Sequence, residues 1–289
     1  MKKVLLLLLS TCLWCQAAYA IDPGRAQGTL MINKEQVDLK EAYAHYHDNA
    51  EGLLDRPKEI RIVLCDRQIP QESLRGIAFL PVTDLAREGQ VKGLLLEFDP
   101  GNLSRMTVTL LRNPPQPGLS LMTLSLVDTE KPPLKRLTIT KTRVEGEIEY
   151  AEKRQAGSDE LPALSWSVKF SAPLFHELPV TADLKGRKAL DSPQVKALRQ
   201  KIAALKKGDY EAMKEVSSEK ANRRNAAMME KMDGGSAKVF AKEAADDLEK
   251  SLKTVKRVVV RSDQAVAICS SGKTWFTFVK EGGAWKSGD

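Results

Sequence analysis

The chain has 289 residues, of which 29% are charged and 42% are hydrophobic, and its formal net charge is +7. This composition is that of a folded protein and excludes an intrinsically disordered one. The length suffices for two domains. After the first 20 residues no run of 18 apolar residues occurs, which predicts no transmembrane helix in the remaining chain.

The first 20 residues have the pattern of a cleavable signal peptide. Lys2 and Lys3 precede an apolar run that starts at Val4, and Ala18-Tyr19-Ala20 provides small residues at a cleavage site. We therefore expect cleavage after Ala20 and an exported, periplasmic or secreted protein. Neither Cys12 nor Cys15 follows the small residue that lipid attachment requires.

Two cysteines, Cys65 and Cys269, remain after cleavage. An oxidising compartment permits a disulfide between them if their Cα atoms come within about 7 Å. Both lie in apolar strand-like runs, where a buried free thiol behaves as a small hydrophobe. The sequence leaves both possibilities open.

Residues 21–176 are predicted to form an all-β sandwich. Apolar and polar residues alternate at Ile60–Leu64, Met106–Leu110 and Leu164–Phe170, and proline- and glycine-rich turns separate these runs. The parity of the apolar residues changes at Lys40–Glu41, which predicts a β-bulge there. A short helix is expected around residues 82–88.

Residues 177–192 are interpreted as a linker, and residues 193–289 as an α+β domain. Ser192 is a helix cap, Pro193 suits the first helical position, and Gly208 suits the end of that helix. Further helices follow, and after Lys256 the apolar period changes to two residues. We expect a four-stranded antiparallel meander at the C-terminus.

The C-terminal third carries the basic character of the chain. It contains 20 lysines and arginines against 14 acidic residues between Asp191 and Asp289. Outside the cytoplasm, anionic lipid headgroups or envelope polymers are more suitable partners for such a surface than nucleic acid. A solvated basic surface that only aids solubility is the alternative interpretation.

The C-terminal region resembles the NTF2-like superfamily, especially its small exported members. The similar features are the helix end at Lys206–Ala212, the helices after it, and the strands around Thr274–Val279 and Glu281–Lys286. The resemblance implies a curved sheet wrapped by helices around a cone-shaped pocket. It implies no catalytic residue here, because no position matches the Asp or His of the enzymatic members.

The N-terminal region resembles a group of uncharacterised secreted bacterial proteins. The similar stretches are Gly28–Asn33, Val37–Ala44 and Ile62–Asp66. This resemblance implies an exported β-rich domain and no known activity.

Motifs for catalysis, metal binding and cofactor binding are weak. His45, His47 and Asp48 form the most metal-like cluster, but a zinc or copper site needs a third convergent ligand, and a solvated strand end is the favoured interpretation. Residues 267–274 nearly spell a phosphate-binding loop, yet they join two predicted strands, whereas such a loop leads into a helix. The sequence predicts no metal and no cofactor.

A binding function without catalysis is favoured, for a small molecule, an envelope polymer or a protein partner. The alternative is an isomerase- or lyase-type enzyme that uses the C-terminal pocket, and the third hypothesis is a structural module of the cell envelope. Aromatic and methionine side chains are the candidate lining of that pocket: Phe276, Phe278, Trp285, Met228 and Met232.

Overall fold

The computed structural model describes residues 24–53, 57–70, 73, 80–114, 121–127, 134–151, 162–230, 234–271 and 274–288. The predicted signal peptide and its cleavage site lie outside these residues. The described part of the protein is mostly β, with 49% of its residues in strands and 26% in helices. It forms two compact units, one made of residues 24–47 and 58–176 and the other of residues 48–57 and 177–288.

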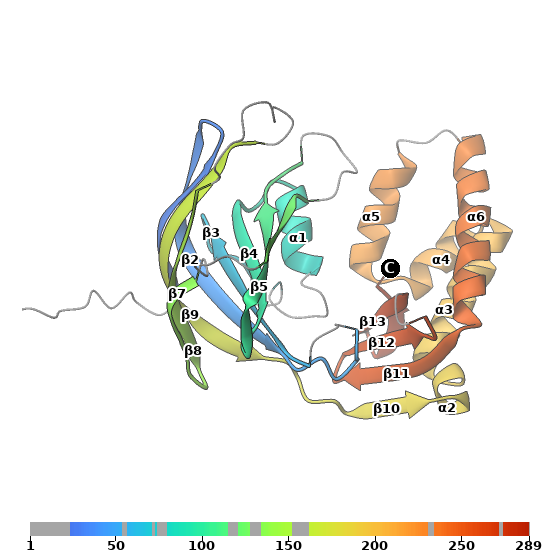
Figure 1. Ribbon diagram of the computed structural model, residues 1–289. Coiled ribbons are helices and arrows are strands. Elements are labelled where there is room, and N and C mark those ends of the chain that lie inside the picture. The colour runs from blue at the N-terminus through green and yellow to red at the C-terminus, as the bar shows by residue number, and fades with distance from the viewer. Residues whose placement is uncertain are drawn as a thin grey trace, which may run out of the picture. The chain divides into compact units, whose positions relative to one another are not determined.

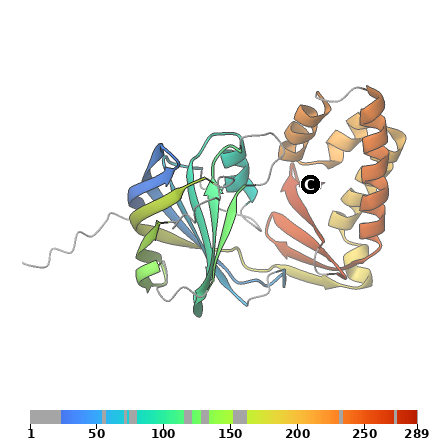
Figure 2. The same ribbon diagram turned by 45° about the horizontal axis from the view of Figure 1, so that its top comes forward.

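The N-terminal unit contains a single curled sheet of nine strands (Figures 1 and 2). In the sheet order β6-β5-β4-β3-β2-β1-β9-β8-β7, all eight pairs of neighbouring strands are antiparallel. The strands are β1 (Arg25–Ile32), β2 (Glu35–His47), β3 (Glu59–Cys65), β4 (Gly93–Asp99), β5 (Asn102–Leu111), β6 (Thr123–Val127), β7 (Leu134–Ile139), β8 (Arg143–Ala151) and β9 (Leu164–His176).

The single sheet corrects the predicted sandwich of two sheets. Strand β1 pairs with β2 on one side and with β9 on the other, so it joins the two halves of the domain into one sheet. Beyond the start of β1, strands β2 and β9 pair directly in parallel, from Ala44–Leu174 to Tyr46–His176. Alternation within each strand shows which face is buried, but it does not show that strands from both halves share hydrogen bonds.

Both faces of the central strands are covered. The inner face carries the main apolar core, which includes Leu30, Ile62, Leu96 and Trp166. A second cluster on the opposite face includes residues of β3, of β4 and of helix α1 (Leu80–Arg87). All seven residues of β3 are therefore buried. Helix α1 confirms the short helix expected in this region.

The C-terminal unit is an α+β structure with a five-stranded antiparallel sheet in the order β10-β11-β12-β13-β14. Its strands are β10 (Ala182–Lys185), β11 (Val255–Arg261), β12 (Gln264–Cys269), β13 (Trp275–Glu281) and β14 (Ala284–Ser287). Its helices are α2 (Arg187–Leu190), α3 (Pro193–Lys207), α4 (Tyr210–Val216), α5 (Glu219–Met229) and α6 (Gly234–Leu252). None of the described helices combines the length and the apolar character that crossing a membrane requires.

The predicted linker 177–192 is wrong in its second half, because β10 and α2 lie within it. Strand β10 adds a fifth strand to the expected meander by pairing with β11. Its four residues alternate between intermediate and exposed side chains, so it carries little apolar signal.

Local signals position helix α3 as predicted. The Ser192 hydroxyl accepts a hydrogen bond from the Val195 N–H at 3.3 Å, and Gly208 ends the helix with a φ of 67°. Val195, Leu198 and Ile202 then face the apolar core of the unit. This helix is therefore fixed by both capping and packing.

Candidate functional site

The β2 side chains change faces at a slip in register between β1 and β2. Two residues of β1 lie opposite the single residue Lys40, so the ladder slips at the predicted position, with the extra residue on β1. Before the slip the odd-numbered side chains of β2 join the inner core, and after it the even-numbered ones do. His45 and His47 are therefore turned to the opposite face of the sheet.

On that face the sheet carries a row of buried ionisable residues. His45 lies opposite Arg61 and His47 lies opposite Glu59 across β2 and β3. Glu97 of β4 lies opposite Arg61 on its other side. Arg61 forms an ion pair with Glu59, and its Nε lies 3.4 Å from Oε1 of Glu97.

The row lies within a largely apolar part of the sheet. The exposed fractions are 2% for both His45 and Arg61, 1% for His47 and 0% for Glu59. The expectation that the histidines form a solvated strand end is therefore wrong. Buried charges are costly unless they are paired, so Arg61 and Glu59 depend on each other.

Arg261 of β11 is the centre of a second ion-pair network, which lies in the C-terminal unit. Its Nε lies 2.6 Å from Oε1 of Glu51, and its Nη2 lies 3.3 Å from Oε2 of Glu177. It also forms an ion pair with Asp48 and donates a hydrogen bond to the Leu178 carbonyl at 2.5 Å. One arginine thus holds carboxylates from two separate chain segments.

Burial and hydrogen bonding both act on this network. The Glu51 side chain is fully buried and the Arg261 side chain is 6% exposed. Burial alone would raise the pKa of Asp48, but hydrogen bonds from Arg261 and from the Ala50 N–H outweigh it and hold the pKa below its ordinary value of 3.8. For Arg261, burial opposes the charged form, but hydrogen bonds to Glu51 and Asp48 raise the pKa further.

Arg257, also on β11, binds the same segment. Its guanidinium donates to the Ala50 carbonyl at 2.8 Å and to the Glu51 carbonyl at 3.1 Å. It also forms an ion pair with Asp183 of β10 at 2.7 Å. Residues 48–51 are therefore fixed to β11 by two arginines on the same strand.

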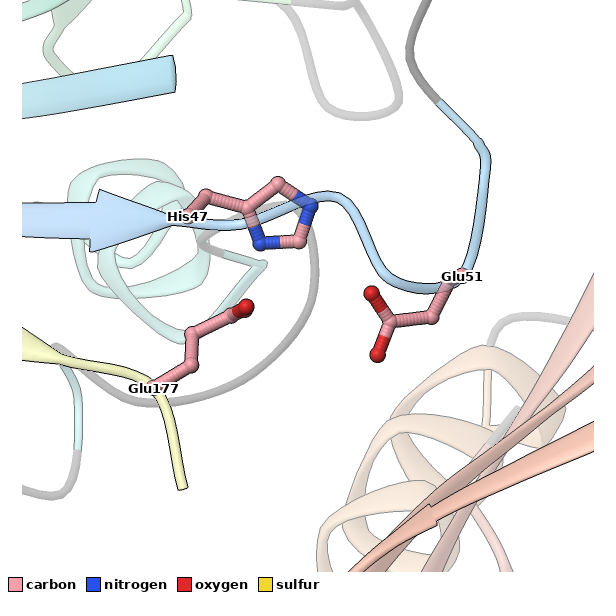
Figure 3. A group of neighbouring side chains, drawn as sticks. All are labelled: His47, Glu51 and Glu177. Atoms are coloured by element: carbon pink, nitrogen blue, oxygen red, sulfur yellow. The ribbon is translucent and has the colours of Figure 1, made fainter. Parts of the chain in front are cut away.

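His47, Glu51 and Glu177 come together as a group with metal-ligand chemistry. One ligand atom of each lies within 4.8 Å of the others (Figure 3). Both glutamates already bind Arg261. A fixed positive charge on two of the three ligands opposes a divalent cation, so we assign no metal function to this group.

A polar cleft of about 450 Å³ lies in the N-terminal unit, at one end of β2, β3 and β4. The start of β2, the residues after β3 and the residue before β4 meet there because the three strands are antiparallel neighbours. The lining residues are Glu35, Gln36, Val37, Asp38, Lys40, Asp66, Arg67 and Lys92. Three are basic and three are acidic.

The charges of the cleft are partly paired. Lys92 Nζ lies 2.5 Å from Oε1 of Glu35, and Arg67 Nη2 lies 2.8 Å from Oδ2 of Asp66. The hydrogen bond and charge of Lys92 lower the pKa of Glu35, which is therefore ionised at neutral pH. Lys40 forms no ion pair with another described residue and is exposed, so its charge is open to a ligand.

The Asp66 carboxylate binds the backbone of Lys92, another residue that lines the cleft. Its Oδ1 accepts from the Lys92 N–H at 2.9 Å, while its own N–H donates to the Lys92 carbonyl at 3.0 Å. These backbone bonds hold the position of Lys92 next to β3. The Lys92–Glu35 ion pair is solvent-exposed, and such pairs contribute little to stability and can rearrange around a ligand.

The predicted pocket residues of the C-terminal unit lie in or beside its core. Phe276 is 4% exposed and Phe278 is 1% exposed, and both pack in the apolar cluster of this unit. Trp285 packs against the same cluster from a partly buried position. Met232 lies outside the described residues, and so does the side chain of Met228. Their role in a pocket stays a prediction.

Cys65 and Cys269 are both buried and free. The Cys65 thiol donates to the Arg67 carbonyl at 3.2 Å, and the Cys269 thiol donates to the Ser251 carbonyl at 3.4 Å. Burial raises the pKa of Cys65 to about 12. The sequence left open a disulfide or two buried free thiols, and the structure has the buried free thiols.

The sequence analysis missed the cleft, the arginine of β3 and the two arginines of β11. Arg61 alternates with isoleucines, a signal that equally fits an exposed residue on a half-buried strand. The cleft and the Arg261 network join residues that are far apart in the chain. No protein-family model, curated protein or solved structure matches this chain.

Proposed function

We propose that the protein is an exported binding protein without catalytic activity, and that the polar cleft of its N-terminal unit is the ligand site. The observation that carries this proposal is the lining of the cleft, with three basic and three acidic side chains around about 450 Å³. Export rests on the pattern of the first 20 residues.

The charge pattern favours a small zwitterionic ligand, such as an amino acid or a short peptide. Lys40 is available for a carboxylate, and the carboxylates of Glu35 and Asp38 lie in the same lining for an ammonium group. The ion pairs between exposed side chains exchange at low cost, because each contributes only about 0–1 kcal/mol. A hydrogen bond to a charged group contributes about 1.5–3 kcal/mol, which allows a few such contacts to select the ligand.

The enzyme alternative has less support. A C-terminal pocket enzyme needs an acid or base in an inward-facing pocket. Among the described residues of that unit, Glu51 is a buried carboxylate, and Arg261 binds it. Lys201 is a buried base, and its Nζ donates to Ser287 Oγ at 3.3 Å. Neither side chain lines the cleft that is formed by described residues.

The proposal includes kinship of the C-terminal unit with the NTF2-like superfamily. Supporting it are the order of helices followed by an antiparallel meander and the packing of α3 and α6 on that sheet. The added edge strand β10 departs from the expected four-stranded meander.

Calorimetric titration with alanyl dipeptides tests the proposed ligand class. Ala-Glu, Ala-Lys and Ala-Ala with free termini are compared with the same peptides acetylated and amidated. We expect binding of the free forms, at least about tenfold weaker binding of the capped forms, and the same loss in Lys40→Ala and Lys92→Ala.

Lys135→Ala is the matched control for Lys92→Ala. Lys135 forms an exposed ion pair with Glu149 at 2.5 Å, the same distance as the Lys92–Glu35 pair, with similar exposure. The Lys135→Ala variant should bind the dipeptides as the wild type does. Equal binding by all three variants, or the absence of binding by the wild type, would contradict the proposed ligand.

A further inference from the structure

The described residues include four exposed large hydrophobic side chains, and two of them are neighbours. Val239 and Phe240 lie next to each other near the start of α6 and are 59% and 41% exposed. The other two, Ile139 and Val180, lie singly elsewhere. Adjacent exposed apolar side chains mark an interaction surface more strongly than single ones do.

Exposed basic residues lie on the same helix as this apolar pair and on the helix before it. Arg223 and Arg224 are exposed on α5, and Lys242 is exposed one turn after Val239. The end of α5 and the start of α6 lie at the same end of the unit (Figures 1 and 2). Between residues 223 and 242 the sequence has five lysines and arginines against two acidic residues.

The charges of this surface are largely available to a partner. Arg224 and Lys242 form no ion pair with another described residue, and Arg223 pairs only with the exposed Glu219, at 2.8 Å. The buried side of α6 includes Ala241, Ala245 and Leu252, whereas Val239 and Phe240 are exposed. Acidic residues begin at Glu243, further along α6.

We propose that Val239 and Phe240, with Arg223, Arg224 and Lys242, form a docking surface for an anionic lipid bilayer. An apolar pair inserts at the level of the headgroups while neighbouring lysines and arginines bind the lipid phosphates. This surface lies in the C-terminal unit and is independent of the proposed ligand cleft. It holds the exported protein at a membrane face.

Vesicle sedimentation with the full mature chain tests this inference. Vesicles of equal parts phosphatidylglycerol and phosphatidylcholine are compared with vesicles of phosphatidylcholine alone. We expect binding to the anionic vesicles only, weakened by salt because the contact is electrostatic. Binding to both vesicle types alike, or to neither, overturns the proposal.

Two variants separate the apolar and the charged contributions. Val239→Ser/Phe240→Ser and Arg224→Gln/Lys242→Gln should each reduce binding to anionic vesicles by roughly tenfold or more. Circular dichroism of each variant should match the wild type, since all four side chains are exposed. Ile139→Ser and Lys135→Gln/Arg136→Gln are the matched controls at exposed sites of the other unit, and they should bind fully. Unchanged binding in both test variants contradicts this surface.

Discussion

Glu51 and Arg261 are 210 residues apart in the chain and form a buried ion pair, with 2.6 Å between Glu51 Oε1 and Arg261 Nε. The segment that contains Glu51 belongs to the C-terminal unit, and this pair is one of its contacts with β11. The unit is therefore discontinuous in sequence, and its stability depends on a segment that lies between two strands of the N-terminal sheet.

Removing Glu51 should destabilise the C-terminal unit strongly. Glu51→Ala leaves Arg261 buried with weaker partners, and breaking a buried pair costs about 3–5 kcal/mol. Urea unfolding, followed by a probe for each unit, measures the change. The control is Asp247→Ala, which removes an exposed pair with Lys250 and should cost less than about 1 kcal/mol. Equal effects of the two substitutions would contradict this view of the network.

Acid should weaken the same unit through Asp48 and Asp183. Hydrogen bonds from Arg257 lower the pKa of Asp183, and those from Arg261 and Ala50 lower the pKa of Asp48 against the effect of burial. Since the folded pKa is lower than the unfolded one, the unfolded state binds more protons between the two values. The contribution of the two ionised carboxylates to the stability of the unit is therefore fully present above about pH 3.8, and it is lost as the pH falls through their folded pKa values.

Asp48→Asn/Asp183→Asn should flatten the decline of stability below pH 4. Both carboxylates are partly exposed, so each contributes only about 1 kcal/mol or less. Unfolding midpoints measured from pH 6 to pH 2.5 give the two profiles. If the unfolding midpoints of the double variant and of the wild type decline in parallel below pH 4, these carboxylates do not cause the loss of stability in acid.

Arg61 and Glu59 should behave as an interdependent pair. Arg61→Ala leaves the fully buried Glu59 without its main counter-charge and should lower the free energy of unfolding by about 3–5 kcal/mol. The double variant Arg61→Met/Glu59→Leu removes both charges, so it should recover most of that loss. A double variant that is less stable than Arg61→Ala would refute the coupling; a double-mutant cycle measures it.

The two cysteines should resist modification in the folded protein. The pKa of Cys65 is raised to about 12, so only roughly one thiol in ten thousand is ionised at pH 8, and Cys269 is buried as well. A chain beginning at Ile21 carries only these two cysteines. It should react with a thiol reagent at neither position when folded and at both when unfolded in denaturant. A mass showing an internal disulfide would contradict the free thiols.

Local structure could be predicted from the sequence where the signals are local. The cap at Ser192 and the end at Gly208 define helix α3, and the change of apolar parity at Lys40 marks the slip between β1 and β2. The joining of the sheet through β1 could not be predicted, because inward alternation is the same in one curled sheet and in two packed sheets.

The candidate sites were harder to predict than the elements. The alternation within β3 predicts that Arg61 is exposed. It is buried because other residues, among them those of α1, cover that face of the sheet, and the pattern within β3 does not show this cover. The cleft combines residues 35–40, 66–67 and 92, which meet only through strand pairing. Arg261 and Glu51 carry no shared pattern in the sequence.

Mapping of amide chemical shifts during titration with Ala-Glu is the most direct measurement of the proposed function. The changes should concentrate at Glu35–Lys40, Asp66–Arg67 and Lys92, and they should disappear in Lys40→Ala while persisting in Lys135→Ala. Shifts centred on another part of the chain, or no shifts at all, would contradict a zwitterion-binding cleft at the edge of β2, β3 and β4.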